Sequence, residues 1–168
     1  MVTIRCTRKL LQRIGPPGQV SAPSSTLLGD WCAGPVAVGH QRFVLLISEH
    51  SRLPVIMPGR DVKHLARNFP DALARVLAGL GIEASAVERE VEATREAVIA
   101  ATNNRSLLGT LNDFSFLLSA HMENAPEIDL VDLALWVSRA PVSSLGMTSP
   151  DRVTRDLLAQ RAEGSQGV

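Results

Sequence analysis

The stretch WCAGPVAVGHQRFVLLISEHSRLPVIMP, residues 31–58, decides the fold class of this chain. It holds three apolar runs, WCAGPVAV, RFVLLIS and LPVIMP, and the short separators GHQ and EHSR divide them. Short runs rich in Val, Ile and Leu and bounded by Gly, His and Ser predict strands, and short connections between strands favour hairpins. We therefore predict an antiparallel meander with strands near 31–38, 42–48 and 53–57.

The middle run is apolar at every position from Phe43 to Ile47. A strand without polar alternation is expected to be covered on both faces. The segment 61–80 supplies one cover, because its apolar residues recur at helical spacing and Gly81 stands where a C-terminal glycine is expected. Pro70 should kink or divide this helix, since proline lacks the backbone N–H.

The remaining elements lie on either side of these segments. A strand near 2–6 and a helix near 7–14 open the chain, and a Gly-, Pro- and Ser-rich loop follows at 15–25. We predict a further strand near 97–102 and helices near 85–95, 105–122, 128–138 and 150–162. Ser85 and Glu88 have the spacing of a capping box, and Ser149-Pro150 has the pattern of an N-cap followed by proline at the first helical position.

Clustered strands followed by clustered helices indicate an α+β fold rather than alternating βαβ units. We expect a mainly antiparallel sheet covered by helices. The chain of 168 residues is long enough for one domain with a core and short for two. The prediction is therefore a single α+β domain over residues 1–162 with a frayed C-terminal tail at 163–168.

Composition restricts the function classes. The chain has 17 Lys plus Arg and 17 Asp plus Glu, so it has no net charge to draw it to nucleic acid or to an anionic membrane. Its N-terminus is locally basic before Asp30, but no aromatic residue lies near that cluster to stack on bases. The sequence predicts no secretory h-region, and no apolar run in it approaches the roughly 20 residues that span a bilayer. We expect a cytoplasmic protein with no membrane partner, and nucleic acid as an unlikely one.

No complete catalytic, cofactor or metal motif is legible. Four histidines are scattered and neither cysteine has CxxC spacing, so no metal site is predicted. The chain lacks GxxxxGK[ST], GxGxxG and GxSxG, so no nucleotide cofactor and no nucleophile elbow are predicted. Cys6 lies among Arg5, Arg8 and Lys9, which could stabilise a thiolate, although a cysteine that ends a strand is more commonly packed. We expect reduced, buried cysteines.

The stretch NNRSLLGTLNDF, residues 103–114, begins the most regular predicted helix and carries the candidate site. At about 100° per residue, four side-chain positions fall on one line nearly opposite the leucine stripe: Arg105, Gly109, Asn112 and Phe116. A glycine inside a helix costs roughly 0.5 to 1 kcal/mol relative to alanine. Gly109 therefore suggests that backbone, a ligand or another helix approaches closely.

Two interpretations of this line stay open. In the first, the line and the adjacent Asp113 border a cleft or partner surface, where arginine and amide side chains suit a carboxylate or a backbone. In the second, the line packs beneath the helix near 128–138, and Asn112 bonds a loop. The first depends on the N-cap, because Arg105 leaves the line if Ser106 caps the helix instead of one of the two asparagines before it.

Four segments together resemble a known family: RCTRKLL at 5–11, TLLGDW at 26–31, NNRSLLGTLNDF at 103–114 and SPDRVTRDLL at 149–158. In this order they are similar to an uncharacterised bacterial family, a domain of unknown function. The resemblance implies a small bacterial α+β protein and brings no established activity, cofactor or catalytic residue. Two positions depart from the pattern: Cys32 replaces an expected aromatic, and APVSSLG at 140–146 lacks a cysteine, so we expect no thiol role for that segment.

These observations leave three function classes. We favour a non-catalytic binding or regulatory protein that uses the polar helix face for a small ligand or a protein partner. The predicted binding residues are Arg105, Gly109, Asn112, Asp113 and Phe116. The alternative is an enzyme of unrecognised type with Arg105, Asn112 and Asp113, or Cys6, in its site. Contact with nucleic acid through the basic N-terminus is the third possibility.

Overall fold

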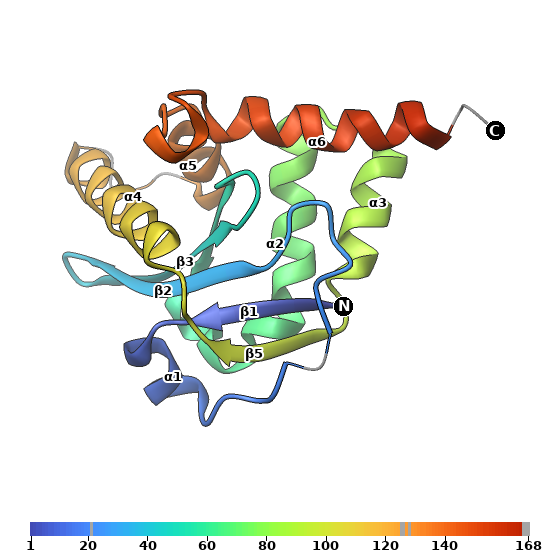
Figure 1. Cartoon of the computed structure of the whole chain (residues 1–168). Coiled ribbons are helices and arrows are strands. Elements are labelled where there is room, and N and C mark those ends of the chain that lie inside the picture. Colours follow the sequence, from blue (N-terminus) through green and yellow to red (C-terminus); the bar gives the residue numbers. More distant parts are fainter. Residues whose placement is uncertain (21, 125–126, 128, 166–168) are drawn as a thin grey trace.

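The computed structural model describes residues 1–20, 22–124, 127 and 129–165, and its elements surround one five-stranded sheet (Figure 1). The strands are β1 (Val2–Cys6), β2 (Trp31–Val38), β3 (Gln41–Ser48), β4 (Pro54–Pro58) and β5 (Ala97–Ala101). The helices are α1 (Arg8–Ile14), α2 (Leu65–Gly79), α3 (Ala84–Ala93), α4 (Arg105–Asn124), α5 (Leu130–Val137) and α6 (Pro150–Ser165). Two 3-10 turns, η1 (Gly59–His64) and η2 (Ser143–Leu145), complete the described elements. The predicted α+β class is confirmed.

The sheet has the strand order β4-β3-β2-β1-β5 and is mixed. The meander is confirmed, because β2 pairs with β3 and β3 pairs with β4, both antiparallel. β1 instead pairs parallel with both β2 and β5. Parallel neighbours need a crossover connection, and helices supply it: α1 lies between β1 and β2, and the chain from β4 passes through α2 and α3 before it reaches β5.

Helices cover both faces of this sheet, as the apolar middle strand requires. Trp31 of β2 packs edge-on against Phe69 of α2, with ring centroids 4.9 Å apart. A Cβ placed at Gly34 of β2 would meet Leu111 of α4 at 2.6 Å. Residues three apart in a strand point to opposite faces, so α2 and α4 lie on opposite faces of the sheet (Figure 1). Phe43 is half-buried and the rest of that run is fully buried.

The segment predicted as a helix over 61–80 divides, but not at Pro70. It begins as the 3-10 turn η1 and continues from Leu65 as α2, which runs unbroken through the buried Pro70. The predicted division at Pro70 is wrong, because the missing N–H removes one bond near the start of the helix and the ring packs into the core. The predicted glycine end is confirmed: Gly81 has φ 78° and the N–H of Ile82 donates to the carbonyl of Leu77 at 3.2 Å.

The capping box predicted at Ser85 and Glu88 is wrong. α3 begins at Ala84 with Glu83 at the N-cap position, so Ser85 already lies inside the helix. Its hydroxyl donates to a Glu83 carboxylate oxygen at 2.8 Å instead of accepting a backbone N–H. The Ser85 side chain therefore does not satisfy a free backbone N–H of the first turn, which is what a capping box requires.

The caps of the last helices follow the local sequence. The Asn104 side-chain oxygen accepts the N–H of Leu107 at 3.1 Å, so Asn104 is the N-cap and Arg105 is the first residue of α4. Asp129 caps α5, while Ile128 of the predicted 128–138 helix lies outside the described residues. α6 begins at Pro150 as predicted and continues to Ser165, and residues 166–168 of the predicted tail lie outside the described residues. Of the helices described, none has both the length and the apolar content to cross a bilayer.

Candidate functional site

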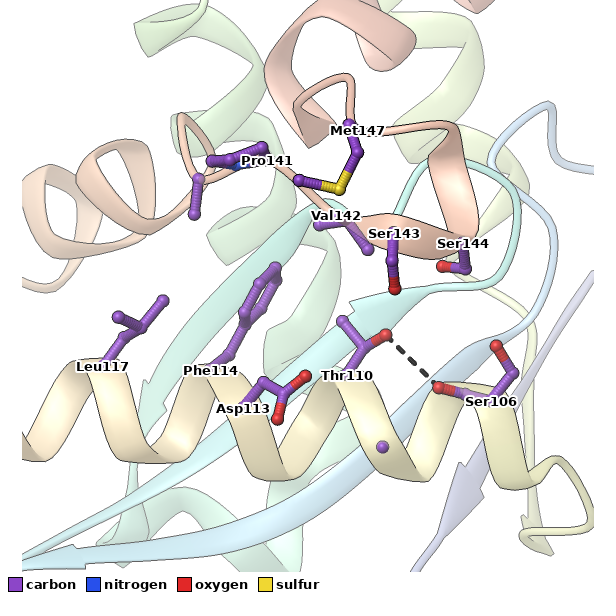
Figure 2. Close-up of a pocket in the computed structure, with 12 residues that line it drawn as sticks. Ser106, Thr110, Asp113, Phe114, Leu117, Pro141, Val142, Ser143, Ser144 and Met147 are labelled. Atoms are coloured by element: carbon purple, nitrogen blue, oxygen red, sulfur yellow. Dashed lines mark hydrogen bonds between the residues drawn. The ribbon is translucent and has the colours of Figure 1, made fainter.

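A cleft of about 340 Å³ lies between α4 and the segment 140–147, which connects α5 to α6 (Figure 2). Its lining residues on α4 are Ser106, Gly109, Thr110, Asp113, Phe114 and Leu117. Their spacing of three and four residues places them along one side of the helix, next to the leucine stripe that faces the sheet. The opposite wall consists of Ala140, Pro141, Val142, Ser143, Ser144 and Met147.

The two ends of the cleft differ in polarity. Figure 2 shows the hydroxyls of Ser106, Ser143 and Ser144 gathered at one end, and Leu117 and Pro141 at the other. Ser106 and Leu117 are separated by about 16 Å along the helix axis at 1.5 Å per residue. The cleft is therefore amphipathic along its length.

The wall formed by 140–147 has an unusual backbone. Gly146 and Met147 have φ values of 67° and 65°, so a non-glycine residue follows a glycine in the left-handed region. The Met147 side chain is 63% exposed above the cleft. Left-handed backbone at a bulky residue is disfavoured by sterics, and such positions gather at ligand sites.

Arg52 connects both walls at the polar end. It lies in the β3–β4 connection and is only 9% exposed. Its Nε donates to the Ser144 Oγ at 3.3 Å, and its Nη2 donates to the Ser106 Oγ at 3.1 Å. Its Nη1 donates to the backbone carbonyl of Glu49 at 2.9 Å. Arg52 thus joins three segments that are far apart in sequence.

Among the described side chains, none supplies a carboxylate within ion-pair distance of Arg52. The ion pairs among the described side chains are Arg5–Asp30, Arg95–Glu92 and Arg155–Asp151. Burial lowers the pKa of Arg52, while the nearby Glu49 carboxylate and Cys32 oppose this shift. One Glu49 carboxylate oxygen accepts the N–H of Asp30 at 3.1 Å. Arginine stays protonated in proteins, so a buried cation bonded to neutral oxygens lies behind the two serines.

The backbone of Arg52 is also strained. Its φ is 61°, a left-handed value that L-residues other than glycine rarely adopt. Such a conformation costs on the order of 1 to 2 kcal/mol for a residue with a Cβ. The three hydrogen bonds of the guanidinium offset this cost.

Of the predicted site residues, Gly109 and Asp113 line the cleft, and both are exposed. Arg105, Asn112 and Phe116 are exposed on the outward face of α4 and do not line it. Phe116 is 75% exposed. The interpretation in which this line packs beneath α5 is wrong, because all four of its positions, including Gly109, are exposed.

Gly109 is surrounded by open space. A Cβ built at this position would meet no atom within 4 Å among those considered. By contrast, a Cβ at Gly34 would meet Leu111 and one at Gly79 would meet Leu135 at 2.8 Å. Neither a backbone segment nor a second helix of the described chain therefore requires glycine at position 109.

Sequence reasoning missed Arg52, Ser106 as its partner, and Ser144. Arg52 belongs to the separator EHSR, which indicated only a hairpin connection. Ser144 belongs to APVSSLG, whose spacing carries no binding motif. No short-range pattern marks either residue, because the bonds that join them span 54 and 92 positions of the chain.

Cys6 is unsuited to the role of an accessible nucleophile. Both Cys6 and Cys32 are free and fully buried. Burial, with a smaller contribution from Cys32, raises the pKa of the Cys6 thiol to about 12. Burial also raises the pKa of Cys32, although the Thr102 hydroxyl and Arg52 oppose it. Both thiols are protonated at neutral pH.

Within the described residues, no cluster of three or more His, Cys, Asp or Glu side chains could hold a metal ion.

Two of the segments that carry the family resemblance form structural junctions. In TLLGDW, the backbone N–H groups of Leu27 and Leu28 donate to the buried carboxylate of Glu90 at 3.1 and 3.0 Å. In SPDRVTRDLL, the Thr154 hydroxyl donates to the Ser51 hydroxyl at 2.9 Å. The bonds to Glu90 hold the loop before β2 against α3. The bond from Thr154 holds α6 against the β3–β4 connection.

A family model described as a domain of unknown function (DUF6933) matches residues 3–153. The chain belongs to the DUF6933 family. The matched span contains every residue that lines the cleft, together with Arg52. The resemblance to an uncharacterised domain family is therefore confirmed. No curated protein and no solved structure matches this DUF6933 chain.

Proposed function

We propose that this DUF6933 chain is a non-catalytic binding or regulatory protein that holds a small molecule in the cleft between α4 and segment 140–147. The observation that carries the proposal is the open space at Gly109. A helix-interior glycine costs stability, and the packing of the described chain does not require one at this position. Gly109 is one of the residues that line the cleft, so we expect a larger side chain there to narrow it.

The size and lining of the cleft support a small ligand. Its volume of about 340 Å³ is at the lower end of the roughly 300 to 1,000 Å³ of small-molecule pockets. Hydroxyls lie at one end, and Phe114, Leu117 and Val142 supply apolar surface. A matching ligand has a hydrogen-bonding group and a short apolar part.

The test is an NMR titration of the labelled protein against a library of small carboxylates, phosphates, alcohols and amides. We expect ligands that shift the amide signals of cleft residues such as Thr110 and Val142. Gly109→Leu fills the cleft and should weaken these ligands at least about tenfold, which is about 1.4 kcal/mol.

Asn112→Leu is the matched control, since it places the same side chain on the same helix outside the cleft. It should leave the affinities unchanged. A library without a cleft ligand, or ligands that bind Gly109→Leu as tightly as the parent protein, would overturn the proposal.

A second candidate is a protein partner on the outward face of α4, favoured by the exposure of Phe116. Arg105 and Asn112 lie on the same exposed face and could bond a partner backbone. Phe116→Ser should then abolish capture of that partner in a pull-down while ligand binding in the cleft persists. Retained capture would dismiss this face.

The other proposals concern class and location. An enzyme would have to use Asp113 at the cleft with Arg105 and Asn112 on the neighbouring face, since Cys6 is buried. We propose a single domain over 1–162, located in the bacterial cytoplasm, without a cofactor and without a nucleic-acid partner. The balanced charge of the chain supports the absence of a nucleic-acid partner, and the resemblance to a bacterial family supports the bacterial location.

A further inference from the structure

The polar end of the cleft contains two serine hydroxyls that are both oriented by one buried arginine. Arg52 donates to the Oγ of Ser106 and to the Oγ of Ser144. A serine hydroxyl has a single proton to donate. Because each oxygen already accepts from the guanidinium, each hydroxyl proton is directed away from Arg52. Both serines are exposed and line the cleft, so these protons are available to a group bound there.

The positive charge behind the serines strengthens them as donors. Hydrogen bonds polarise one another in chains, and the guanidinium donates into both hydroxyls. Arg52 makes its three bonds to neutral oxygens, which leaves two of its five N–H groups outside these bonds. Only the two serine hydroxyls would therefore separate an anion bound to them from the buried guanidinium of Arg52.

The charged groups around this end favour an anion. Arg105 is adjacent to Ser106 and the N-terminal end of α4 adds a partial positive charge. Asp113 also lines the cleft, but it lies about 10 Å further along the helix axis than Ser106. The Glu49 carboxylate already accepts the N–H of Asp30. Within the cleft lining, the cationic end is thus separated from Asp113, while Glu49 lies near Arg52 outside the lining.

We infer that the ligand of the cleft carries an oxyanion, a carboxylate or a phosphate, which Ser106 and Ser144 bind with the charge of Arg52 behind them. This inference rests on the proposed function, because it names the ligand class of the same cleft. The apolar part of the ligand then extends over Phe114 and Val142 toward Leu117. The two hydroxyls donate hydrogen bonds to the oxygens of the anion, and the apolar wall limits the length of the ligand's apolar tail.

The test compares three probes that share one tail: hexanoate, hexyl phosphate and 1-hexanol. In NMR titrations, the anionic probes should shift the amide signals of Ser106 and Ser144 and the Nε–H signal of Arg52. We expect the tighter anion to bind at least about tenfold more tightly than 1-hexanol, as for hydrogen bonds to a charged group. Tighter binding of hexanoate indicates a carboxylate ligand, and tighter binding of hexyl phosphate indicates a phosphate ligand.

Ser106→Ala and Ser144→Ala should each weaken the tighter anion about five- to tenfold and weaken 1-hexanol less, since a hydrogen bond to a charged acceptor is stronger than one to a neutral hydroxyl. Ser115→Ala is the control, because Ser115 lies on the same helix and its hydroxyl donates to the Leu111 carbonyl outside the cleft. Anions that bind no better than 1-hexanol, or that bind both alanine variants unchanged, would overturn the inference. If library ligands are nevertheless lost in Gly109→Leu, the proposed function stands and only the oxyanion assignment fails. If Gly109→Leu retains every ligand, the proposed function fails as well.

Discussion

Replacing Gly109 by alanine should stabilise the protein, although the residue lies in the resemblance segment NNRSLLGTLNDF. Gly109 is inside α4, which runs from Arg105 to Asn124, and its side-chain position is exposed. An added Cβ would meet no atom within 4 Å, so the methyl group creates no clash. Alanine also restricts the unfolded chain more than glycine does, which lowers the entropy cost of folding.

The expected magnitude follows from helix propensity. Glycine in a helix interior is roughly 0.5 to 1 kcal/mol less favourable than alanine. For a domain of 150 to 250 residues, 1 kcal/mol corresponds to a change in Tm of about 2 to 4 °C. Gly109→Ala should therefore raise the Tm by about 1 to 4 °C. Thermal and urea unfolding followed by circular dichroism would measure both quantities.

Gly79→Ala is the matched control within the same chain. Gly79 is also helical, but a Cβ there would meet the Leu135 Cδ1 at 2.8 Å. The propensity gain should be cancelled or reversed by this contact, so this variant should not gain stability. A destabilised Gly109→Ala protein, or equal stabilisation of both variants, would refute the reasoning that the fold has no use for glycine at 109.

Three further predictions concern residues that hold the structure together. Arg52→Ala should destabilise the protein by about 2 to 4 kcal/mol because three hydrogen bonds are lost, whereas Arg52→Gly should be about 1 kcal/mol less damaging because glycine adopts φ 61° without strain. Equal urea midpoints for the two variants would contradict the strain argument. Burial raises the pKa of Cys6 from 9.0 to about 12, so the unfolded state loses this proton first. The stability contributed by the neutral thiol is complete below pH 9.0 and should be lost as pH rises toward 12, and Cys6→Ala should flatten that part of the pH profile of unfolding. Glu90→Gln should cost about 1 to 3 kcal/mol, since its carboxylate accepts two backbone N–H groups, while the exposed Glu88→Gln on the same helix should be neutral in the same denaturation assay.

Local patterns determined the elements of this protein. The three apolar runs of residues 31–58 form the predicted meander, because strand pairing across short connections depends on residues close in sequence. Gly81 ends α2 and Pro150 begins α6 where their backbone preferences place them. The sequence left the N-cap of α4 undecided between Ser106 and the two asparagines before Arg105, and in the structure Asn104 is the N-cap. Each of these decisions involves interactions over a few residues.

The tertiary structure alone decided the direction in which β1 joins the sheet and the composition of the site. β1 pairs parallel with β2 and β5, and those pairings depend on how the connecting helices pack across the sheet. The helix line that includes Arg105 and Asn112 predicted a cleft or partner surface, but only Gly109 of that line, together with Asp113, lines the cleft. The second wall of the cleft comes from residues 140–147, which packing brings against α4. Arg52 reaches Ser106 and Ser144 across 54 and 92 positions of the chain, so no local periodicity or motif could have revealed the hydroxyl pair that it orients.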